Sequence, residues 1–178
     1  YETLTLCTYP LVTHSGTDKA KKGGRVYLGI LLSTSIGFLF IAIVWTWLIT
    51  GNLDFTPGGI LEGKASDLVI GILFALYMFG VGKAALMPVH RWLPAAMVAP
   101  TPVSALLHAV AVVKAGVFTV IKVVIYIFGI DYLSSIGTTN WLLYVSGFTI
   151  LTASVLAIRQ DNLKRRLAYS TISQLSYV

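Results

Sequence analysis

The stretch GVGKAALMPVHRWLP, from Gly80 to Pro94, places a single lysine in a largely apolar run. Lys83 has no acidic residue near it in sequence, because the chain holds none between Asp67 and Asp131. Pro88 follows five residues later, and proline lacks the backbone N–H that a continuous α-helix requires. An isolated ammonium group followed by a helix breaker predicts an interrupted helix in hydrophobic surroundings.

The composition around this stretch is that of a membrane protein. Of the 178 residues, 56% are hydrophobic and only 11% are charged, whereas soluble domains hold about a quarter charged residues. The single Cys7 excludes an internal disulfide framework and an all-cysteine metal site. We therefore interpret the chain as membrane-embedded and exclude a water-soluble globule.

Long apolar runs predict the membrane spans, since about 20 apolar residues cross the hydrocarbon core. The chain has four such runs, at 26–49, 68–89, 103–130 and 141–158, and residues 1–12 and 167–178 resemble the end of one further span and the start of another. The fold class we expect is an all-α, polytopic transmembrane helix bundle of about six spans, two of them partial, with one broken helix near Pro88. Residues 1–178 would form a single transmembrane domain. Because no signal-peptide pattern opens the chain, we expect an internal fragment of a longer one.

The loop charges predict the orientation. Residues 18–25 and 159–166 hold four Lys or Arg each, and the connection 90–102 adds Arg91. The alternate connections hold only Lys64 between them. This asymmetry follows the positive-inside rule and predicts that loops 18–25 and 159–166 are cytoplasmic. The formal charge of +6 is thus a topology signal, and we predict no nucleic-acid partner.

Three ionisable side chains lie inside the run 103–130, namely His108, Lys114 and Lys122. A charge at bilayer depth is costly and marks a functional position, unless the long side chain extends to the membrane interface. Such snorkelling remains the alternative for Lys83, Lys114 and Lys122. In a regular helix Lys114 is rotated by about 120° from His108. A one-residue π-bulge would align them, so we expect irregular backbone near 109–114.

Pro88 predicts that the helix carrying Lys83 is broken just after the lysine and that the carbonyl of Ala84 is left free. In lipid, such a free group persists only when it lines a cavity or is buried in protein. Interrupted helices place charge and backbone dipoles at the midplane sites of transporters. A packing kink without a transport role is the alternative.

Other motifs are incomplete. GVGKAA lacks the first glycine and the final Ser/Thr of a phosphate loop. His14, His90 and His108 lie on different segments, which argues against a bis-histidine haem or a metal site. No Ser–His–Asp or paired-carboxylate arrangement is visible.

The block GKAALMPVHRWLPAAMVAPTPVSALLHAVAVVKAGVF, Gly82–Phe118, resembles the antiporter-like membrane subunits of respiratory complex I, of the multi-subunit (Mrp-type) sodium/proton antiporters and of the membrane-bound hydrogenases. DNLKRRLAYSTISQLSYV, Asp161–Val178, and YETLTLCTYPLV at the start are similar to two further signatures of this family. The resemblance implies a fold of about fourteen helices with two inverted repeats of five helices, each with one broken helix. Ala95 departs from the acid that often follows WLP.

The resemblance also implies roles for individual residues. Glu2 matches the glutamate of the fifth helix, Lys83 the lysine of the broken seventh helix, and His108 and Lys114 the histidine and lysine of the eighth. These four would form a proton relay, with Lys122 and His90 as auxiliary or pathway-lining residues and Pro88 as the helix break. Desolvation favours the neutral form of a lysine and a nearby carboxylate favours the charged form, so movement of Glu2 would load and unload Lys83.

The function we expect is that of a proton-translocating subunit in a complex I-like NADH:quinone oxidoreductase or a cation/proton antiporter. The chain would have no catalytic centre and bind no cofactor, with quinone, NADH, flavin or iron–sulfur clusters only in partner subunits. Its partners would be the bilayer, other membrane subunits, protons and Na⁺, in a bacterial-type cell membrane. A non-conducting structural subunit and a cation or bicarbonate permease are the alternatives.

Overall fold

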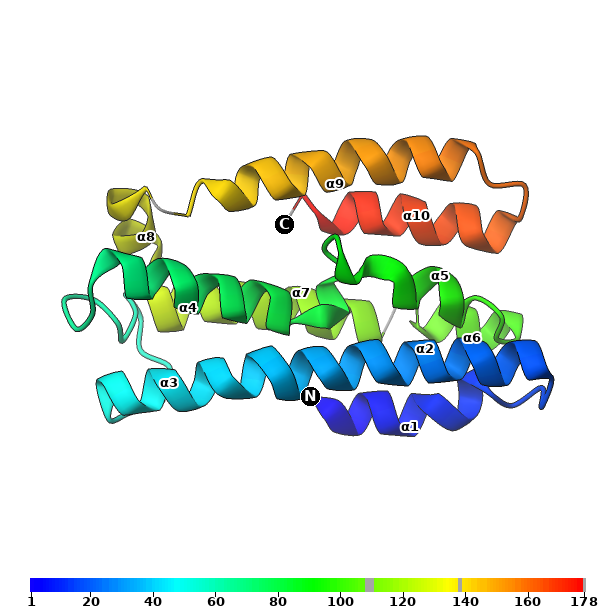
Figure 1. Ribbon diagram of the computed structural model, residues 1–178, viewed down its shortest axis with the longest axis horizontal. Coiled ribbons are helices and arrows are strands. Elements are labelled where there is room, and N and C mark those ends of the chain that lie inside the picture. Colours follow the sequence, from blue (N-terminus) through cyan, green and yellow to red (C-terminus); the bar gives the residue numbers. More distant parts are fainter. Residues whose placement is uncertain (108–110, 138, 178) are drawn as a thin grey trace.

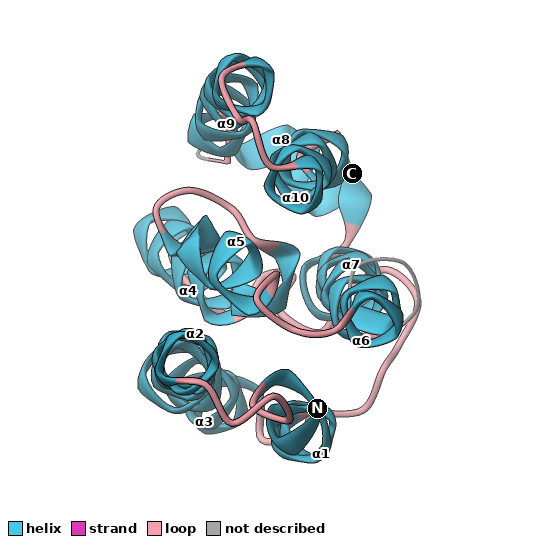
Figure 2. Ribbon diagram, turned by 90° about the vertical axis from the view of Figure 1, so that its right-hand side faces the viewer, coloured by secondary structure: helices cyan, strands magenta, loops and turns pink. Residues whose placement is uncertain are grey.

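The computed structural model describes residues 1–107, 111–137 and 139–177, and within these ranges the chain is helical with no β-strand. The longer helices run along one axis and are stacked in three layers, whereas the short α8 crosses this axis at one end (Figures 1 and 2). In order, the elements are α1 (Glu2–Val12), α2 (Asp18–Thr34), η1 (Ser35–Leu39), α3 (Phe40–Thr50), α4 (Asp67–Gly80), η2 (Gly82–Ala84), η3 (Val89–Arg91), α5 (Trp92–Ala96), α6 (Thr101–Ala105), α7 (Val112–Lys122), η5 (Val123–Phe128), α8 (Ile130–Ile136), α9 (Trp141–Ile158) and α10 (Leu163–Leu175).

The three layers bring distant parts of the chain together. The first layer holds α1 beside the continuous rod α2–η1–α3, the second holds α4 and α5 beside α6 and α7, and the third holds the hairpin α9–α10 (Figure 2). The strongest contacts join α2 to α5, η2 to α7, η1 to α4 and α9 to α10. The segment that carries Lys83 therefore lies in the middle layer, between the first-layer rod and α7.

Two helices of the described residues are long and apolar enough to cross a membrane, Asp18–Thr50 and Trp141–Ile158. A third span results if Val112–Phe128 and Ile130–Ile136 are counted together, although these segments meet at an angle of 77°. The bend falls at Gly129, whose φ of +84° favours glycine. The prediction of an all-helical chain with apolar membrane helices is confirmed.

The expected span 68–89 is interrupted earlier than the sequence predicted. α4 ends at Gly80, three residues before Lys83, and Pro88 lies in a turn that follows the 3-10 helix η2. The prediction of a helix broken just after the lysine, with Pro88 freeing the Ala84 carbonyl, is therefore wrong in its detail. The helix stops because glycines at 80 and 82 have low helix propensity and allow close packing.

Irregular backbone was expected near 109–114, but the described part of this stretch is irregular only at Ala111, and the irregularity begins earlier, at Leu106. Leu106 and Leu107 are π-helical, and the N–H of Ala111 donates to the carbonyl of Leu106, five residues back. Regular α-helix resumes at Val112. Residues 109 and 110 and His108 lie outside the described residues.

Two apolar cores hold the bundle together. One surrounds Tyr27, Trp92 and Ile172, and the other surrounds Phe74, Tyr77 and Phe128. Ala85 packs in the first core, and Val81 and Ala84 pack with the second. The break between α4 and η3 thus lies at the boundary between the two cores.

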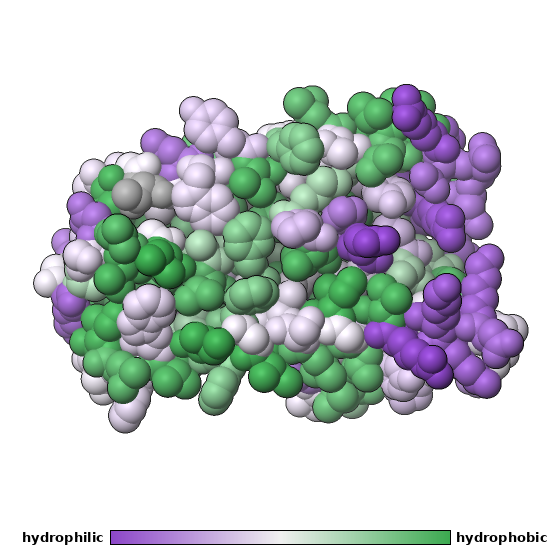
Figure 3. Space-filling view, viewed as in Figure 1, coloured by the Kyte–Doolittle hydropathy of each residue, from purple (hydrophilic) through white to green (hydrophobic). Residues whose placement is uncertain are grey.

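The ends of the bundle differ in polarity. The loop before α2 and the loop between α9 and α10 lie at the same end, opposite the α3–α4 and α8–α9 connections (Figure 1). The space-filling view shows hydrophilic residues gathered over that end and apolar residues over the body (Figure 3). The two predicted basic segments, 18–25 and 159–166, therefore share one end of the molecule. The prediction that 18–25 is a loop is wrong, because these residues form the first turns of α2, and in the second segment α10 begins at Leu163.

Candidate functional site

The break that carries Lys83 is shaped by glycines at which neighbouring elements approach closely. A Cβ at Gly80 would lie 2.6 Å from the backbone nitrogen of Leu39 in η1. At Gly82 it would collide with the hydroxyl of Thr34, and at Gly116 in α7 it would lie 2.5 Å from the carbonyl carbon of Lys83. These contacts fix the break between the first-layer rod and α7.

The backbone carbonyl of Gly82, in the break, finds its hydrogen-bond donors locally. The carbonyl of Gly82 accepts hydrogen bonds from the indole Nε1 of Trp92, at 2.9 Å, and from the N–H of Ala85, at 3.1 Å. Ala85 adopts the left-handed conformation, with a φ of +57°. Because a buried carbonyl without a donor would be costly, the fully buried Trp92 stabilises the interrupted helix.

The break places Lys83 in a fully buried position, with 0% of the residue exposed. Its Nζ lies 2.5 Å from the carbonyl oxygen of Tyr1, 3.5 Å from the centre of the Tyr1 ring and 3.4 Å from Oε1 of Glu2. Lys83–Glu2 is the one ion pair formed within the described residues. A buried charge needs such a partner, because removing either member leaves the other uncompensated.

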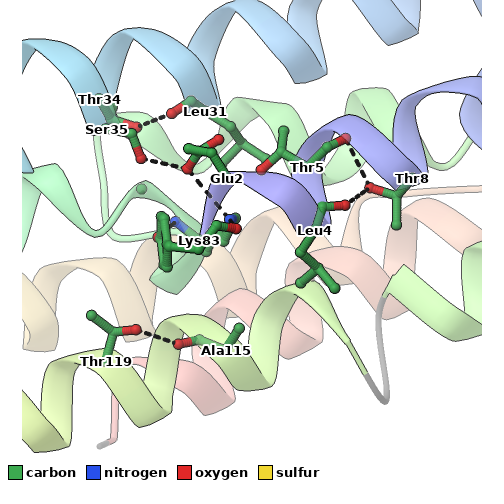
Figure 4. Close-up of polar contacts among 12 residues, drawn as sticks. Glu2, Leu4, Thr5, Thr8, Leu31, Thr34, Ser35, Lys83, Ala115 and Thr119 are labelled. Atoms are coloured by element: carbon green, nitrogen blue, oxygen red, sulfur yellow. Dashed lines mark hydrogen bonds and ion pairs between the residues drawn. The ribbon is translucent and has the colours of Figure 1, made fainter.

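Glu2 is shared between two partners. Its Oε1 accepts a hydrogen bond of 2.5 Å from Oγ of Ser35, the first residue of the π-helix η1, and faces the Lys83 ammonium (Figure 4). Its Oε2 is buried and has no hydrogen-bond partner among the described residues, and the same holds for Oγ1 of the neighbouring Thr5. The carboxylate thus has one occupied oxygen and one free oxygen inside the protein.

The other predicted site residues lie away from this pair. Lys114 is exposed on α7. It precedes Gly116 by two residues, a rotation of about 200° about the helix axis, so its side chain points away from the break. Lys122 is half-buried among aromatic rings, with its Nζ 4.4 Å from the Phe55 ring centre. His90 lies beside Tyr169 of α10, with ring centres 6.4 Å apart and a buried Nδ1 without a partner within the described part of the chain.

The arrangement can hold a proton but offers no ligand set for a metal, since no group of three His, Cys, Asp or Glu side chains comes together in the described residues. An ammonium and a carboxylate in a low-dielectric site can exchange a proton when their separation changes.

The family model for the transmembrane region of NADH:quinone oxidoreductases and Mrp antiporters matches residues 1–178. The chain belongs to this family.

The relatives include quinone oxidoreductase subunits and a chain of an Mrp complex. The chain is 37% identical to the NAD(P)H-quinone oxidoreductase subunit 5 of the Nuphar advena chloroplast and 36% identical to that of Lemna minor, each over 79% of this chain. Among solved structures it is similar to a chain of the Mrp complex from Dietzia sp. DQ12-45-1b, with a TM-score of 0.84 and 31% identity over 99% of this chain. The chain spans 19% of the length of these relatives.

Several residues around Lys83 and Glu2 were not singled out in the sequence. Ser35 gives no signal, because a serine in an apolar helix usually bonds to its own backbone. Tyr1 and Thr34 give none either. Gly80 and Gly82 did carry a signal, since a Gly-x-Gly pair inside an apolar helical run marks a weak point in the helix.

Proposed function

We propose that the chain is part of a proton-translocating membrane subunit, in which Lys83 and Glu2 hold and release a proton. The observation that carries this proposal is the ion pair between a fully buried lysine in a helix break and a carboxylate on a separate helix. Membership of the NADH:quinone oxidoreductase/Mrp antiporter family supports it.

The proposed step depends on the separation of the two groups. With Glu2 at 3.4 Å, the charged form of the lysine is favoured, whereas withdrawal of the carboxylate would leave an isolated ammonium in a low-dielectric site and favour release of its proton. Ser35 on η1 already donates a hydrogen bond to the same oxygen of Glu2. The carboxylate could therefore keep this hydrogen bond while it moves away from Lys83, which would weaken the ion pair without leaving Glu2 unsolvated.

For the onward route we propose His108 and then Lys114, with Lys122 and His90 near the pathway. The α7 helix contacts the break directly through Gly116, which brings this helix close to Lys83. Lys114 is turned away from the break, so transfer to it requires intervening groups. We propose His108 and water for this step, because a neutral imidazole can accept a proton at one nitrogen and donate from the other.

For the longer protein we propose the inverted-repeat fold, with about six spans in residues 1–178 and Pro88 in the helix break. The shared basic end would face the cytoplasm of a bacterial-type cell, in line with the positive-inside rule. The partners would be further membrane subunits that supply the driving force, through quinone, NADH, flavin or iron–sulfur chemistry or through exchange for Na⁺.

The test replaces Lys83 by arginine in the complete multi-subunit complex, with proton movement followed in sealed vesicles by a pH-sensitive dye. Arginine keeps the charge and the ion pair but does not lose its proton near neutral pH. We expect Lys83→Arg and Glu2→Gln to abolish proton movement while the complex still assembles. Lys64→Arg, on the α3–α4 loop, is the matched control and should leave transport unchanged.

The outcomes separate this function from its alternatives. An assembled Lys83→Arg complex that moves protons at the original rate would overturn the relay and favour a structural subunit. Loss of uptake of labelled Na⁺ or bicarbonate, with proton movement intact, would instead favour a permease.

A further inference from the structure

A surface groove of about 490 Å³ lies between α2 and the segment η3–α5, near the basic end of the bundle. Arg25, Val26, Gly29 and Ile30 line it from α2, and Arg91 and Ala95 line it from the other side. The two walls are held close because a Cβ at Gly23 would lie only 2.7 Å from the carbonyl oxygen of Ala95. The groove is therefore a consequence of tight backbone packing.

The rim of the groove is positively charged. Arg25 and Arg91 are both exposed, neither forms an ion pair with a described residue, and no acidic side chain lines the groove. Lys22, one turn before Arg25 on the same face of α2, adds a third positive charge nearby. Two guanidinium groups without a carboxylate partner favour an anion, and their forked donors match the oxygens of a phosphate.

The floor of the groove is apolar and continues along an exposed side of the rod. Val26 and Ile30 lie next to Gly29, at which a Cβ would meet no atom within 4 Å, so the helix surface is hollow there. Beyond it, an exposed apolar stripe follows the helical repeat, and its members Ile36, Phe40, Ile43 and Trp47 are 63%, 61%, 36% and 53% exposed. A small soluble anion has no hydrocarbon that could pack against this floor.

Arg25 also stands at the start of the uncharged part of its helix. It is the last basic residue before the uncharged run 26–49, and arginine at the end of a span reaches toward the interface. The groove thus combines positive charge at its rim, an apolar floor and a position at the start of an apolar run. This combination fits a ligand that has both an anionic group and a hydrocarbon chain.

We propose that the groove binds an anionic phospholipid, with its phosphate between Arg25 and Arg91 and an acyl chain along Val26, Gly29 and Ile30. The site lies near the first turns of α2, away from Ser35 of η1 and Glu2 of α1, and does not depend on proton movement. It would fix α5, and through Trp92 the helix break, against α2 in a membrane that contains anionic lipid.

The test uses the complete complex in nanodiscs that contain a photoreactive phosphatidylglycerol, with photoreactive phosphatidylcholine as the neutral comparison. Labelled peptides are mapped by mass spectrometry. We expect phosphatidylglycerol to label peptides that contain residues 23–31 and 91–97, and phosphatidylcholine to label them less. Each surface arginine is worth about fivefold in lipid affinity, so R25Q with R91Q should lower the labelling about thirtyfold.

Two further variants separate the parts of the proposal. K19Q with R159Q removes the same charge from the same end without touching the groove, and it should leave labelling at these peptides within about twofold. Gly29→Leu fills the hollow with the charges intact and should also reduce labelling. Co-purification of the other subunits confirms assembly of every variant.

Three results would overturn the proposal. Equal loss with K19Q and R159Q would reduce the effect to general surface charge. Displacement of the lipid by inorganic phosphate would assign the site to a soluble anion, and absence of label in the unaltered complex would mean that a protein segment covers the groove.

Discussion

Replacement of Gly116 by alanine should separate α7 from the helix break. The added Cβ would lie 2.5 Å from the carbonyl carbon of Lys83 and 2.6 Å from the backbone nitrogen of Ala84, whereas favourable carbon contacts need about 3.5–4.0 Å. The two backbones must therefore move apart by about 1 Å. Both atoms belong to the backbone, so no side chain can rotate to make room.

The magnitude follows from two opposing terms. Overpacking of this kind costs about 1–3 kcal/mol, and the better helix propensity of alanine returns about 0.8–1.0 kcal/mol. We expect a net local destabilisation of about 1 kcal/mol, together with displacement of Lys83 relative to Glu2. Gly147→Ala in α9 is the matched control, since a Cβ there would meet nothing within 4 Å and only the propensity gain applies.

Hydrogen–deuterium exchange of the complete protein measures this effect where it arises. Amides of residues 80–88 should exchange about fivefold faster in Gly116→Ala, because about 1 kcal/mol of opening free energy corresponds to that factor. Gly147→Ala should leave them unchanged. Unaltered exchange at 80–88 in Gly116→Ala would refute the close approach of α7 to the break.

Three further substitutions test other contacts. Lys122→Met removes a cation–π contact to Phe55, worth about 0.5–1 kcal/mol, and should speed proteolysis of the α3–α4 loop. Gly59→Ala, at a φ of +92° and against the carbonyl of Phe128, should lower the thermal unfolding temperature through strain and collision together. Trp92→Phe removes one of the two hydrogen bonds to the Gly82 carbonyl, and the loss of about 0.5–1.5 kcal/mol should appear as faster amide exchange in the break.

Each of these has a control in the same chain. For Lys122→Met the control is Lys64→Met, which changes a lysine in the α3–α4 loop itself and should leave proteolysis of that loop unchanged. Gly63→Ala, at a φ of +68° with nothing within 4 Å of its Cβ, measures the strain alone, so an equal effect at Gly59 would disprove the collision. Trp47→Phe alters a tryptophan that is 53% exposed, and an equal rise in exchange there would remove the special role of Trp92.

The membrane class and the long helices followed directly from composition. The predicted run 141–158 coincides with α9, and 26–49 lies inside the rod 18–50. Long uncharged runs are reliable signals because lipid forces the backbone to bond within its own segment. The common end of the two basic segments was also predictable, because each crossing of the membrane reverses the side on which the chain emerges.

The start of the break was not predictable from Pro88, because tertiary contacts decide it. Thr34, Trp92 and Gly116 meet the chain at residues 82–84. Thr34 and Gly116 are far from Lys83 in sequence, and Trp92 reaches back to Gly82 across the turn that follows the break. The π-helix η1, likewise, has no marker in its own sequence SIGFL. Local patterns report where a helix is weak, whereas packing decides which weak point opens.

The site was predicted in part. The resemblance paired Glu2 with Lys83, and the structure places them in contact. The partner Ser35 could not be inferred, because its role depends on the register between two helices. The exposure of Lys114 equally depends on which face of α7 carries Gly116.

The π-helix η1 has a mechanical consequence together with the break it touches. Both segments lack the regular i→i−4 hydrogen-bond ladder, and Gly80 holds them in contact at one level of the bundle. Two adjacent rods are thus most compliant at the same height, where the carboxylate of Glu2 bridges them. We expect neutralisation of either charge to leave the other without its partner at this common hinge.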